Sequence, residues 1–290
     1  MKIDNEKILT GRTVFITGSQ KNAGKTTFLK YALTSLRTEK PPVFLTTGID
    51  GEHKDAVFET PKPQIYAQKD DLFITTESMI KHGGGVFEIR EVFPFKTVLG
   101  KLVLLKTLRG GFVELVGPED NKQLSNIIKY IRENENYGTI LIDGAVNRIT
   151  QIVSGVDADF IFVTKISRQN IKSGMDKIRK LSIMEKIPGY NGDENFSDVW
   201  FHKGALTENS IQKIPKNKKT VVIEDFTKIF LPLSRLKSFQ RRKRLFFKDI
   251  FKLIFIVVNL MDIEKKEFME TLDDKDIFDK IVFNPYKAER

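Results

Sequence analysis

The sequence contains no cysteine, only three histidines and a single tryptophan among its 290 residues. Without cysteine the chain can form no disulfide and no thiolate metal site, and it has no thiol nucleophile. The histidines, His53, His82 and His202, lack the spacing of metal ligands, so zinc chemistry is not expected. No apolar run reaches the roughly 18 residues that suggest a membrane helix, and no signal peptide is recognisable. We therefore expect a cytoplasmic protein without a membrane span.

Positive charge exceeds negative charge, with 48 lysines and arginines against 38 acidic residues and a net charge of +10. Such an excess suits an anionic partner, but a lysine-rich solvated surface explains it equally well. We interpret the excess as spread along the chain apart from one cluster at 235–248. On this basis nucleic acid is not the expected partner.

Strands and helices alternate along much of the chain. A buried strand is predicted at 13–18, an amphipathic helix at 26–36 and a second strand at 43–47, which together form a parallel βαβ unit. After a helical stretch within 118–136 the alternation resumes. Its predicted strands are 139–142, 159–164, 199–202, 220–223, 253–258 and 279–283, with helices at 168–184 and 263–272. This order predicts one α/β domain over 1–290, with a mostly parallel sheet and helices on both faces.

Residues of about 56–118 have a different pattern. Short alternating runs such as LFITT and KLVLLKTL are separated by polar or glycine-rich breaks, including the three glycines at 83–85. Alternation with such breaks is typical of antiparallel strands. We expect a β-rich insertion here.

The most specific motif is GSQKNAGKT, which follows the first predicted strand and opens the first predicted helix. Gly24 lets backbone N–H groups approach phosphate oxygens, Lys25 can reach the β and γ phosphates, and the Thr26 hydroxyl can ligate Mg²⁺. An ordinary strand-to-helix turn is the alternative. The residues expected to contact the nucleotide here are Gly18, Ser19, Gln20, Lys21, Asn22, Ala23, Gly24, Lys25, Thr26 and Thr27.

Five residues separate Gly18 from Gly24, whereas the strict P-loop pattern has four. The spacing TG-x5-GKT resembles dethiobiotin synthetase and the related cobyrinate-amidase and molybdopterin-guanine-dinucleotide accessory proteins, which belong to the SIMIBI class of P-loop NTPases. The resemblance implies phosphate binding by Lys25 and Thr26. Lys21 lies one position later than the second, signature lysine of the class.

Two aspartates are candidate metal-orienting and catalytic groups beside Lys25. Asp143 ends the apolar strand in TILIDGAVNR, as the acid of a Walker B segment does, and Arg148 five residues on could contact phosphate. Asp50 follows the strand at 43–47, and its carboxylate could hold a metal-bound water near the γ phosphate. Glu52 and Asp55 are less well placed alternatives, and a solvated Asp-Gly turn is the other reading of Asp50.

A third polar sequence, NLMD at 259–262, follows the apolar run LIFIVV. GTPases carry NKxD at this type of position to read guanine, but the lysine is missing here. ATP is therefore expected rather than GTP, and Asn259 could hydrogen-bond the base.

The segment RLKSFQRRKRLFFK at 235–248 interleaves basic and apolar residues. It predicts an amphipathic helix, which either packs on the sheet with a solvated basic face or docks an acidic protein partner.

Three functions are compatible with these motifs. The first is an accessory ATPase that acts on a protein partner. ITGSQKNAGKTTFLKYAL, TTGIDGE and LIDGAVNR resemble the small reactivase subunit of lysine 5,6-aminomutase, which implies an adenosylcobalamin-dependent aminomutase or a second ATPase subunit as partner. The second is an ATP-dependent ligase or phosphotransferase similar to dethiobiotin synthetase. The third is a nucleotide-binding module without turnover. A homodimer is compatible with each.

Overall fold

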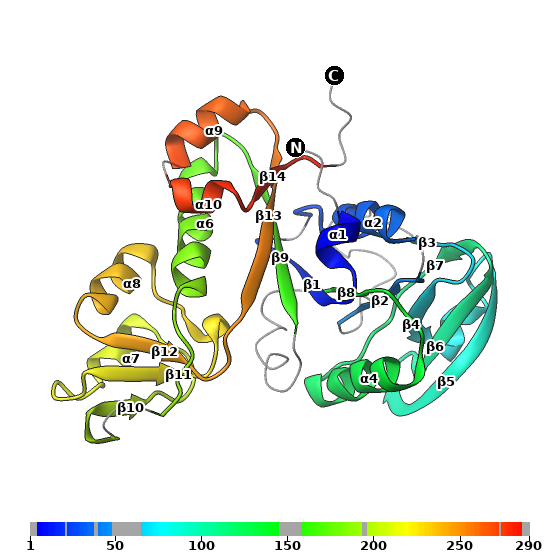
Figure 1. The fold of residues 1–290 in the computed structure, drawn as a ribbon, viewed down its shortest axis with the longest axis horizontal. Helices are drawn as coiled ribbons and strands as arrows, with labels where there is room; N and C mark the ends of the chain where they lie inside the picture. Colours follow the sequence, from blue (N-terminus) through cyan, green and yellow to red (C-terminus); the bar gives the residue numbers. More distant parts are fainter. Residues whose placement is uncertain are drawn as a thin grey trace.

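A nine-stranded sheet forms the centre of the computed structural model, which describes residues 5–20, 22–37, 40–47, 65–144, 158–192, 196–272 and 274–285 (Figure 1). Its strand order is β14-β13-β9-β1-β8-β2-β4-β6-β5. Neighbours from β14 to β4 pair in parallel, and β4, β6 and β5 pair antiparallel. In this spatial order the strands are Ile281–Phe283, Lys252–Leu260, Asp159–Ile166, Thr13–Gly18, Ile140–Asp143, Val43–Thr46, Leu72–Thr76, Gly100–Arg109 and Val86–Thr97. The expected α/β class with a mostly parallel sheet is confirmed.

Helices cover both faces of this sheet. Helix α2 (Lys25–Leu36) packs on one face together with α1 (Asn5–Leu9), while α4 (Asn121–Asn134) and α6 (Ile171–Glu185) pack on the other. The buried residues of α2 are Phe28, Leu29, Ala32, Leu33 and Leu36. Their helical spacing is why this segment folds as an amphipathic helix. Helices α9 (Lys265–Leu272) and α10 (Lys275–Phe278) lie between β13 and β14 in the chain.

The predicted insertion at 56–118 is wrong in one respect, because part of it belongs to the central sheet. Residues 56–64 lie outside the described part. Strand β4 pairs in parallel with β2, and all five of its residues are buried, which is typical of a strand in the middle of a parallel sheet. The antiparallel pair β5–β6 then extends the same sheet, while β3 (Ile65–Ala67) and β7 (Gly111–Val113) form a two-stranded sheet beside it. Helix α3 (Glu77–Ile80) follows β4.

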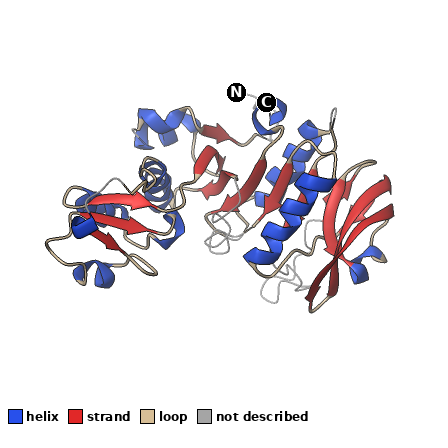
Figure 2. Ribbon diagram, turned by 60° about the horizontal axis from the view of Figure 1, so that its bottom comes forward, coloured by secondary structure: helices blue, strands red, loops and turns tan. Residues whose placement is uncertain are grey.

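The predicted strands at 199–202 and 220–223 lie in a second sheet. Strands β10 (Val199–Phe201), β11 (Thr220–Ile223) and β12 (Arg244–Phe247) form a three-stranded parallel sheet with helices α7 (Glu208–Gln212) and α8 (Leu233–Gln240). We call residues 186–250 the small lobe, which Figure 2 shows to the left of the main sheet. Strand and helix alternation does not specify which sheet a strand joins, so the pattern missed this division.

Aromatic rings join the small lobe to the main sheet. Phe226 stacks on Phe251 with ring centroids 4.0 Å apart, and Phe160 of β9 meets Phe226 edge-on at 5.5 Å. Their side chains belong to the same buried cluster as the apolar residues of α4 and α6. The two sheets therefore share one hydrophobic core.

The single amphipathic helix predicted at 235–248 is also wrong. Helix α8 ends at Gln240, a turn follows, and residues 244–247 form β12. In this strand Leu245 and Phe247 are buried, and pairing with β11 satisfies the backbone. The Leu-Phe-Phe run favours a strand once a neighbouring strand is available.

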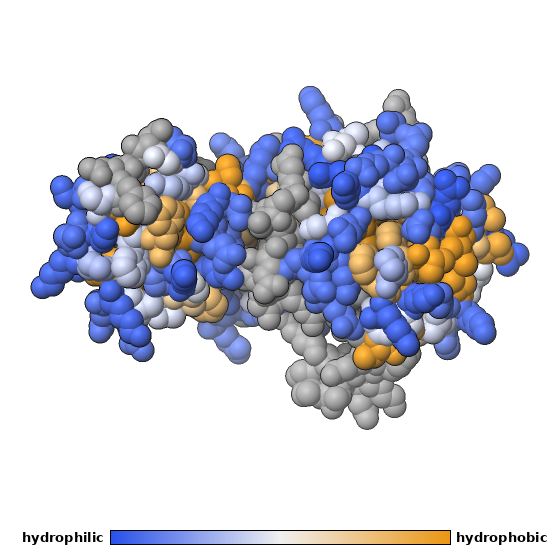
Figure 3. Space-filling model, turned by 90° about the horizontal axis from the view of Figure 1, so that it is seen from below, coloured by the Kyte–Doolittle hydropathy of each residue, from blue (hydrophilic) through white to orange (hydrophobic). Residues whose placement is uncertain are grey.

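The surface of the molecule is uneven in polarity. Seen from below, hydrophilic side chains dominate the left edge, and hydrophobic ones gather on the right over the β4, β5 and β6 end of the sheet (Figure 3). Among the described residues, no helix has both the length and the apolar character needed to cross a bilayer.

Candidate functional site

The segment 18–26, which we call the phosphate loop, leaves the carboxyl end of β1 and is tied to β9. The Ser19 backbone N–H donates to the Val163 carbonyl at 3.0 Å. The Ser19 and Thr164 hydroxyls are hydrogen-bonded at 3.0 Å. Gln20 is exposed, and Lys21 lies outside the described residues. The start of the loop is thus fixed to the neighbouring strand.

The end of the loop turns sharply into α2. Asn22 has φ 59° and Gly24 has φ 99°, both in the left-handed region, where only glycine is free of strain. The Gly24 carbonyl accepts the Phe28 N–H at 2.9 Å, so the helix starts at once. No side chain caps this N-terminus and its first turn contains no acidic residue. The first N–H groups of a helix lack intrahelical acceptors, and together with the helix dipole they form a site for an anion.

The stem of Lys25 lies across the beginning of the loop. A β-carbon placed on Gly18 would approach Lys25 Cγ to 2.9 Å and Cδ to 3.0 Å, closer than atoms in contact normally come. Glycine at position 18 therefore leaves the space through which Lys25 folds back along the loop.

Thr26 and Asp143, predicted from separate motifs, meet at the site. The Thr26 hydroxyl donates to Asp143 Oδ2 at 3.0 Å across 117 positions of sequence. Asp143 ends β8, which pairs directly with β1, and its residue surface is 8% exposed. A hydroxyl and a carboxylate are oxygen ligands of the kind that Mg²⁺ prefers. The described residues contain no cluster of three or more histidines and acids that could hold a metal, so Mg²⁺ here would keep waters or phosphate oxygens as its other ligands.

Threonines at the end of β2 support Asp143 through its backbone, and the sequence reasoning missed them. The Thr46 hydroxyl donates to the Asp143 carbonyl at 3.0 Å, and the Thr47 N–H donates to the same oxygen at 3.0 Å. The signal available in the sequence was a short polar residue placed directly after an apolar strand. Parallel strands bring such residues to one edge of the sheet.

Asn259 supports the phosphate loop from β13. Its amide nitrogen donates to the Ala23 carbonyl at 2.8 Å, and the side chain is buried. Its amide oxygen is buried and has no hydrogen-bond partner among the described residues. At the other end of NLMD, Asp262 Oδ1 accepts the Arg168 N–H at 2.9 Å. The observed role of Asn259 is therefore to hold the loop, and its expected contact with a base stays a prediction.

Asn259→Ala should weaken nucleotide binding without unfolding the protein. Ala23 is 2% exposed, so loss of its partner leaves a buried carbonyl unsatisfied, which costs about 1–3 kcal/mol. We expect an affinity for Mg-ATP lower by about tenfold, because part of this cost loosens the loop. Calorimetric titration measures the dissociation constant of Mg-ATP, and Met261→Ala, at an exposed position, is the control. Equal affinities of Asn259→Ala and wild type would show that the hydrogen bond from Asn259 to the Ala23 carbonyl does not support nucleotide binding.

Several predicted residues cannot be placed. Lys21, Asp50, Glu52, Asp55 and Arg148 all lie outside the described residues. The structure therefore brings together Lys25, Thr26, Asp143 and Asn259 and leaves the position of Asp50 open. Of the histidines, His202 Nε2 is 3.1 Å from the Ala205 carbonyl in the small lobe.

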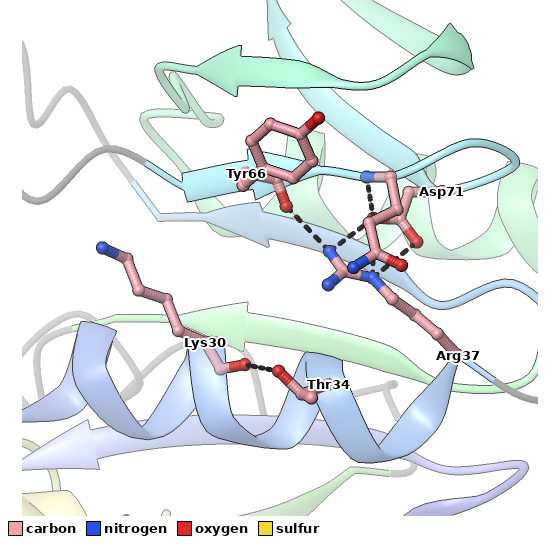
Figure 4. Close-up of polar contacts among 6 residues, drawn as sticks. Lys30, Thr34, Arg37, Tyr66 and Asp71 are labelled. Carbon is pink, nitrogen blue, oxygen red and sulfur yellow. Dashed lines mark hydrogen bonds and ion pairs between the residues drawn. The ribbon is translucent and has the colours of Figure 1, made fainter.

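The opposite end of α2 is anchored by an ion pair that the sequence reasoning did not identify. The Arg37 guanidinium contacts both carboxylate oxygens of Asp71, with 2.6 Å from Nη2 to Oδ2, and also donates to the Tyr66 carbonyl at 2.8 Å (Figure 4). Burial raises the pKa of Asp71, while the hydrogen bonds from Arg37 and from the Gln68 N–H oppose that rise. Helix α2 thus connects the phosphate loop with β3 and β4.

Comparisons with protein-family models, with curated proteins and with solved structures give no match. The chemistry of the site depends on three features of its own. They are an uncapped helix N-terminus, a lysine lying over a glycine, and a hydroxyl paired with a carboxylate at the carboxyl edge of a parallel sheet. Ligands of open α/β sheets bind at this edge.

Proposed function

We propose that the phosphate loop binds ATP with Mg²⁺ and that the protein is an ATPase that serves another enzyme as an accessory or reactivating factor. The observation that carries the proposal is the contact between Thr26 and Asp143 beside the uncapped N-terminus of α2. It combines groups suited to a metal with groups suited to phosphate in one place. An ordinary strand-to-helix turn has no need of this combination.

Each group has a distinct role in this proposal. The N–H groups at the start of α2 bind phosphate oxygens, and Lys25 neutralises the β and γ phosphates. Thr26 and Asp143 would hold Mg²⁺, directly or through water, and the ion would supply charge stabilisation during transfer of the γ-phosphoryl group to water. Asp50 remains the candidate for positioning that water.

An accessory role is favoured over ligase chemistry by the remainder of the fold. The small lobe and the β5–β6 pair lie beyond the elements that form the phosphate loop. Such elements suit contacts with another macromolecule. The resemblance noted in the sequence makes an adenosylcobalamin-dependent aminomutase, or a second ATPase subunit, the candidate partner.

Phosphate release from ATP tests this function. We expect slow, Mg²⁺-dependent hydrolysis that added carboxylate substrates do not change. Asp143→Asn should raise the Mg²⁺ concentration needed for half-maximal rate by about tenfold, because it removes the carboxylate charge at the metal. Asp120→Asn, at the exposed N-terminus of α4, is the matched control. Rapid phosphoryl transfer to a carboxylate would favour the ligase, and Mg-ATP binding without phosphate release would favour a module without turnover.

A further inference from the structure

The positive charge of the chain is concentrated in one stretch of the small lobe. Residues 209–248 contain twelve lysines and arginines but only two acidic residues, Glu224 and Asp225. The net charge of this stretch is thus +10, which equals that of the whole chain, and the remainder is balanced. The basic cluster expected at 235–248 therefore extends back to Lys213, and the excess outside it is less spread along the chain than expected.

Two loops in this stretch form one surface, although they lie far apart in sequence. We call residues 213–219 and 241–244 the basic loops. The Lys243 ammonium donates to the Pro215 carbonyl at 3.2 Å, to the Lys216 carbonyl at 3.1 Å and also to the Lys218 carbonyl. The Arg244 N–H donates to the Lys219 carbonyl at 2.9 Å. Lys243 therefore joins the two loops from within.

Six other cations of the basic loops are exposed, while Lys218 is half-buried and donates to the Ser197 carbonyl at 2.6 Å. The exposed residues are Lys213, Lys216, Lys219, Arg241, Arg242 and Arg244. Like charges held this close repel one another and make the potential of this surface strongly positive. Nothing in the packing of the lobe requires them, because its core is made by residues such as Leu245 and Phe247.

The basic loops are not positioned to bind the ATP of the proposed site, because the phosphate loop and the small lobe lie at opposite edges of the main sheet. The phosphate loop follows the carboxyl end of β1. The small lobe leaves α6 at Glu185, which accepts the N–H of Leu253 near the start of β13 and pairs with Lys280 just before β14. The lobe is thus attached at the amino edge of the sheet. In Figure 1 its sheet extends to the lower left, away from β1.

We propose that the basic loops dock an acidic segment of a protein partner. Arginine presents a planar set of donors that matches a carboxylate, and Arg235 in the same lobe already pairs with Glu208 at 3.3 Å. Neither loop contains an aromatic residue on which a nucleic acid base could stack. The helices of the lobe, α7 and α8, end before the basic loops begin, so none of these cations lies on a helix that could enter a DNA groove. Carboxylates are therefore the anions that this surface fits best.

Binding of fluorescent poly-L-glutamate to the full chain, followed by anisotropy at low salt, tests the proposal. The variant carries Lys216→Glu, Lys219→Glu and Arg241→Glu. The control changes three exposed lysines outside the small lobe by the same charge, Lys101→Glu, Lys122→Glu and Lys129→Glu. We expect the affinity to fall at least about tenfold in the first variant and by less than about threefold in the control, because close charge pairs dominate over distant ones.

Three outcomes overturn the proposal. They are no binding by the wild type, an equal loss in both variants, and tighter binding of single-stranded or duplex DNA or of anionic vesicles than of poly-L-glutamate at equal charge concentration. If the glutamate variant fails to fold, glutamines at the same three positions give the same test. Mg-ATP affinity should be unchanged in all variants, so a failure here is distinguishable from a failure of the proposed ATP site.

Discussion

Lys25→Ala should remove most of the affinity for Mg-ATP. The variant loses a charge-assisted contact with the β and γ phosphates, worth about 1.5–3 kcal/mol, which corresponds to roughly 10- to 150-fold in the dissociation constant. We expect the fold to be retained, because alanine favours the helix that begins at position 25 and leaves Gly18 unobstructed. Calorimetric titration of wild type and variant measures the difference.

Lys30→Ala is the matched control for this prediction. Lys30 is an exposed lysine on the same helix, and its removal changes the net charge by the same amount. It should leave the affinity within about twofold of wild type, because water and salt screen a charge that is exposed to solvent. Equal losses in the two variants would mean that Lys25 acts only through net charge, and the predicted phosphate contact would be wrong.

Arg37→Met should destabilise the protein by about 3–5 kcal/mol, the cost of leaving one member of a buried ion pair without its partner. Asp71 is 1% exposed, and Arg37 supplies its guanidinium contacts as well as the donor to the Tyr66 carbonyl. Urea denaturation measures the change. Lys129→Met removes one member of an exposed pair with Glu133 and should cost less than about 0.5 kcal/mol. A similar small cost for Arg37→Met would show that the pair contributes little.

The cost of Arg37→Met should depend on pH. Burial already raises the pKa of Asp71, and removal of Arg37 takes away the interactions that oppose this rise. A carboxyl with a raised folded-state pKa destabilises the fold when ionised, so its contribution is favourable below the unfolded pKa and is lost as pH rises through the folded pKa. The difference between variant and wild type should therefore shrink as the pH is lowered from about 7 toward about 4, near the ordinary aspartate pKa. A difference that grows on acidification would contradict this assignment.

The sequence predicted the elements whose patterns are local. The spacing of Phe28, Leu29, Ala32, Leu33 and Leu36 fixes both the helix and its buried face, and the apolar run before Gly18 predicts β1. The small lobe could not be predicted, because the residue pattern of a short strand does not indicate which sheet the strand joins. Strand β4 cannot be told from a strand of the insertion by sequence, because its two threonines suggest a partly polar surface although all five of its residues are buried.

The residues that carry the chemistry of the candidate site could be predicted from sequence, but the side chains that hold them in place could not. Thr26 and Asp143 come from two recognisable motifs, and parallel strand order explains why they meet. The hydrogen bond from Asn259 to Ala23 joins residues that are 236 positions apart, and no local pattern indicates that pairing. The same holds for Arg37 with Asp71, where the partner is chosen by the packing of α2 against β3 and β4.

Calorimetric titration of the wild-type protein with ATP, GTP and a non-hydrolysable ATP analogue, each with and without Mg²⁺, is the decisive test of nucleotide binding. We expect one Mg²⁺-dependent binding event with ATP and with the analogue, weaker binding of GTP, and loss of the event in Lys25→Ala. Absence of heat with every nucleotide, in a protein that circular dichroism shows to be folded, would contradict the claim that the loop between β1 and α2 binds a nucleoside triphosphate.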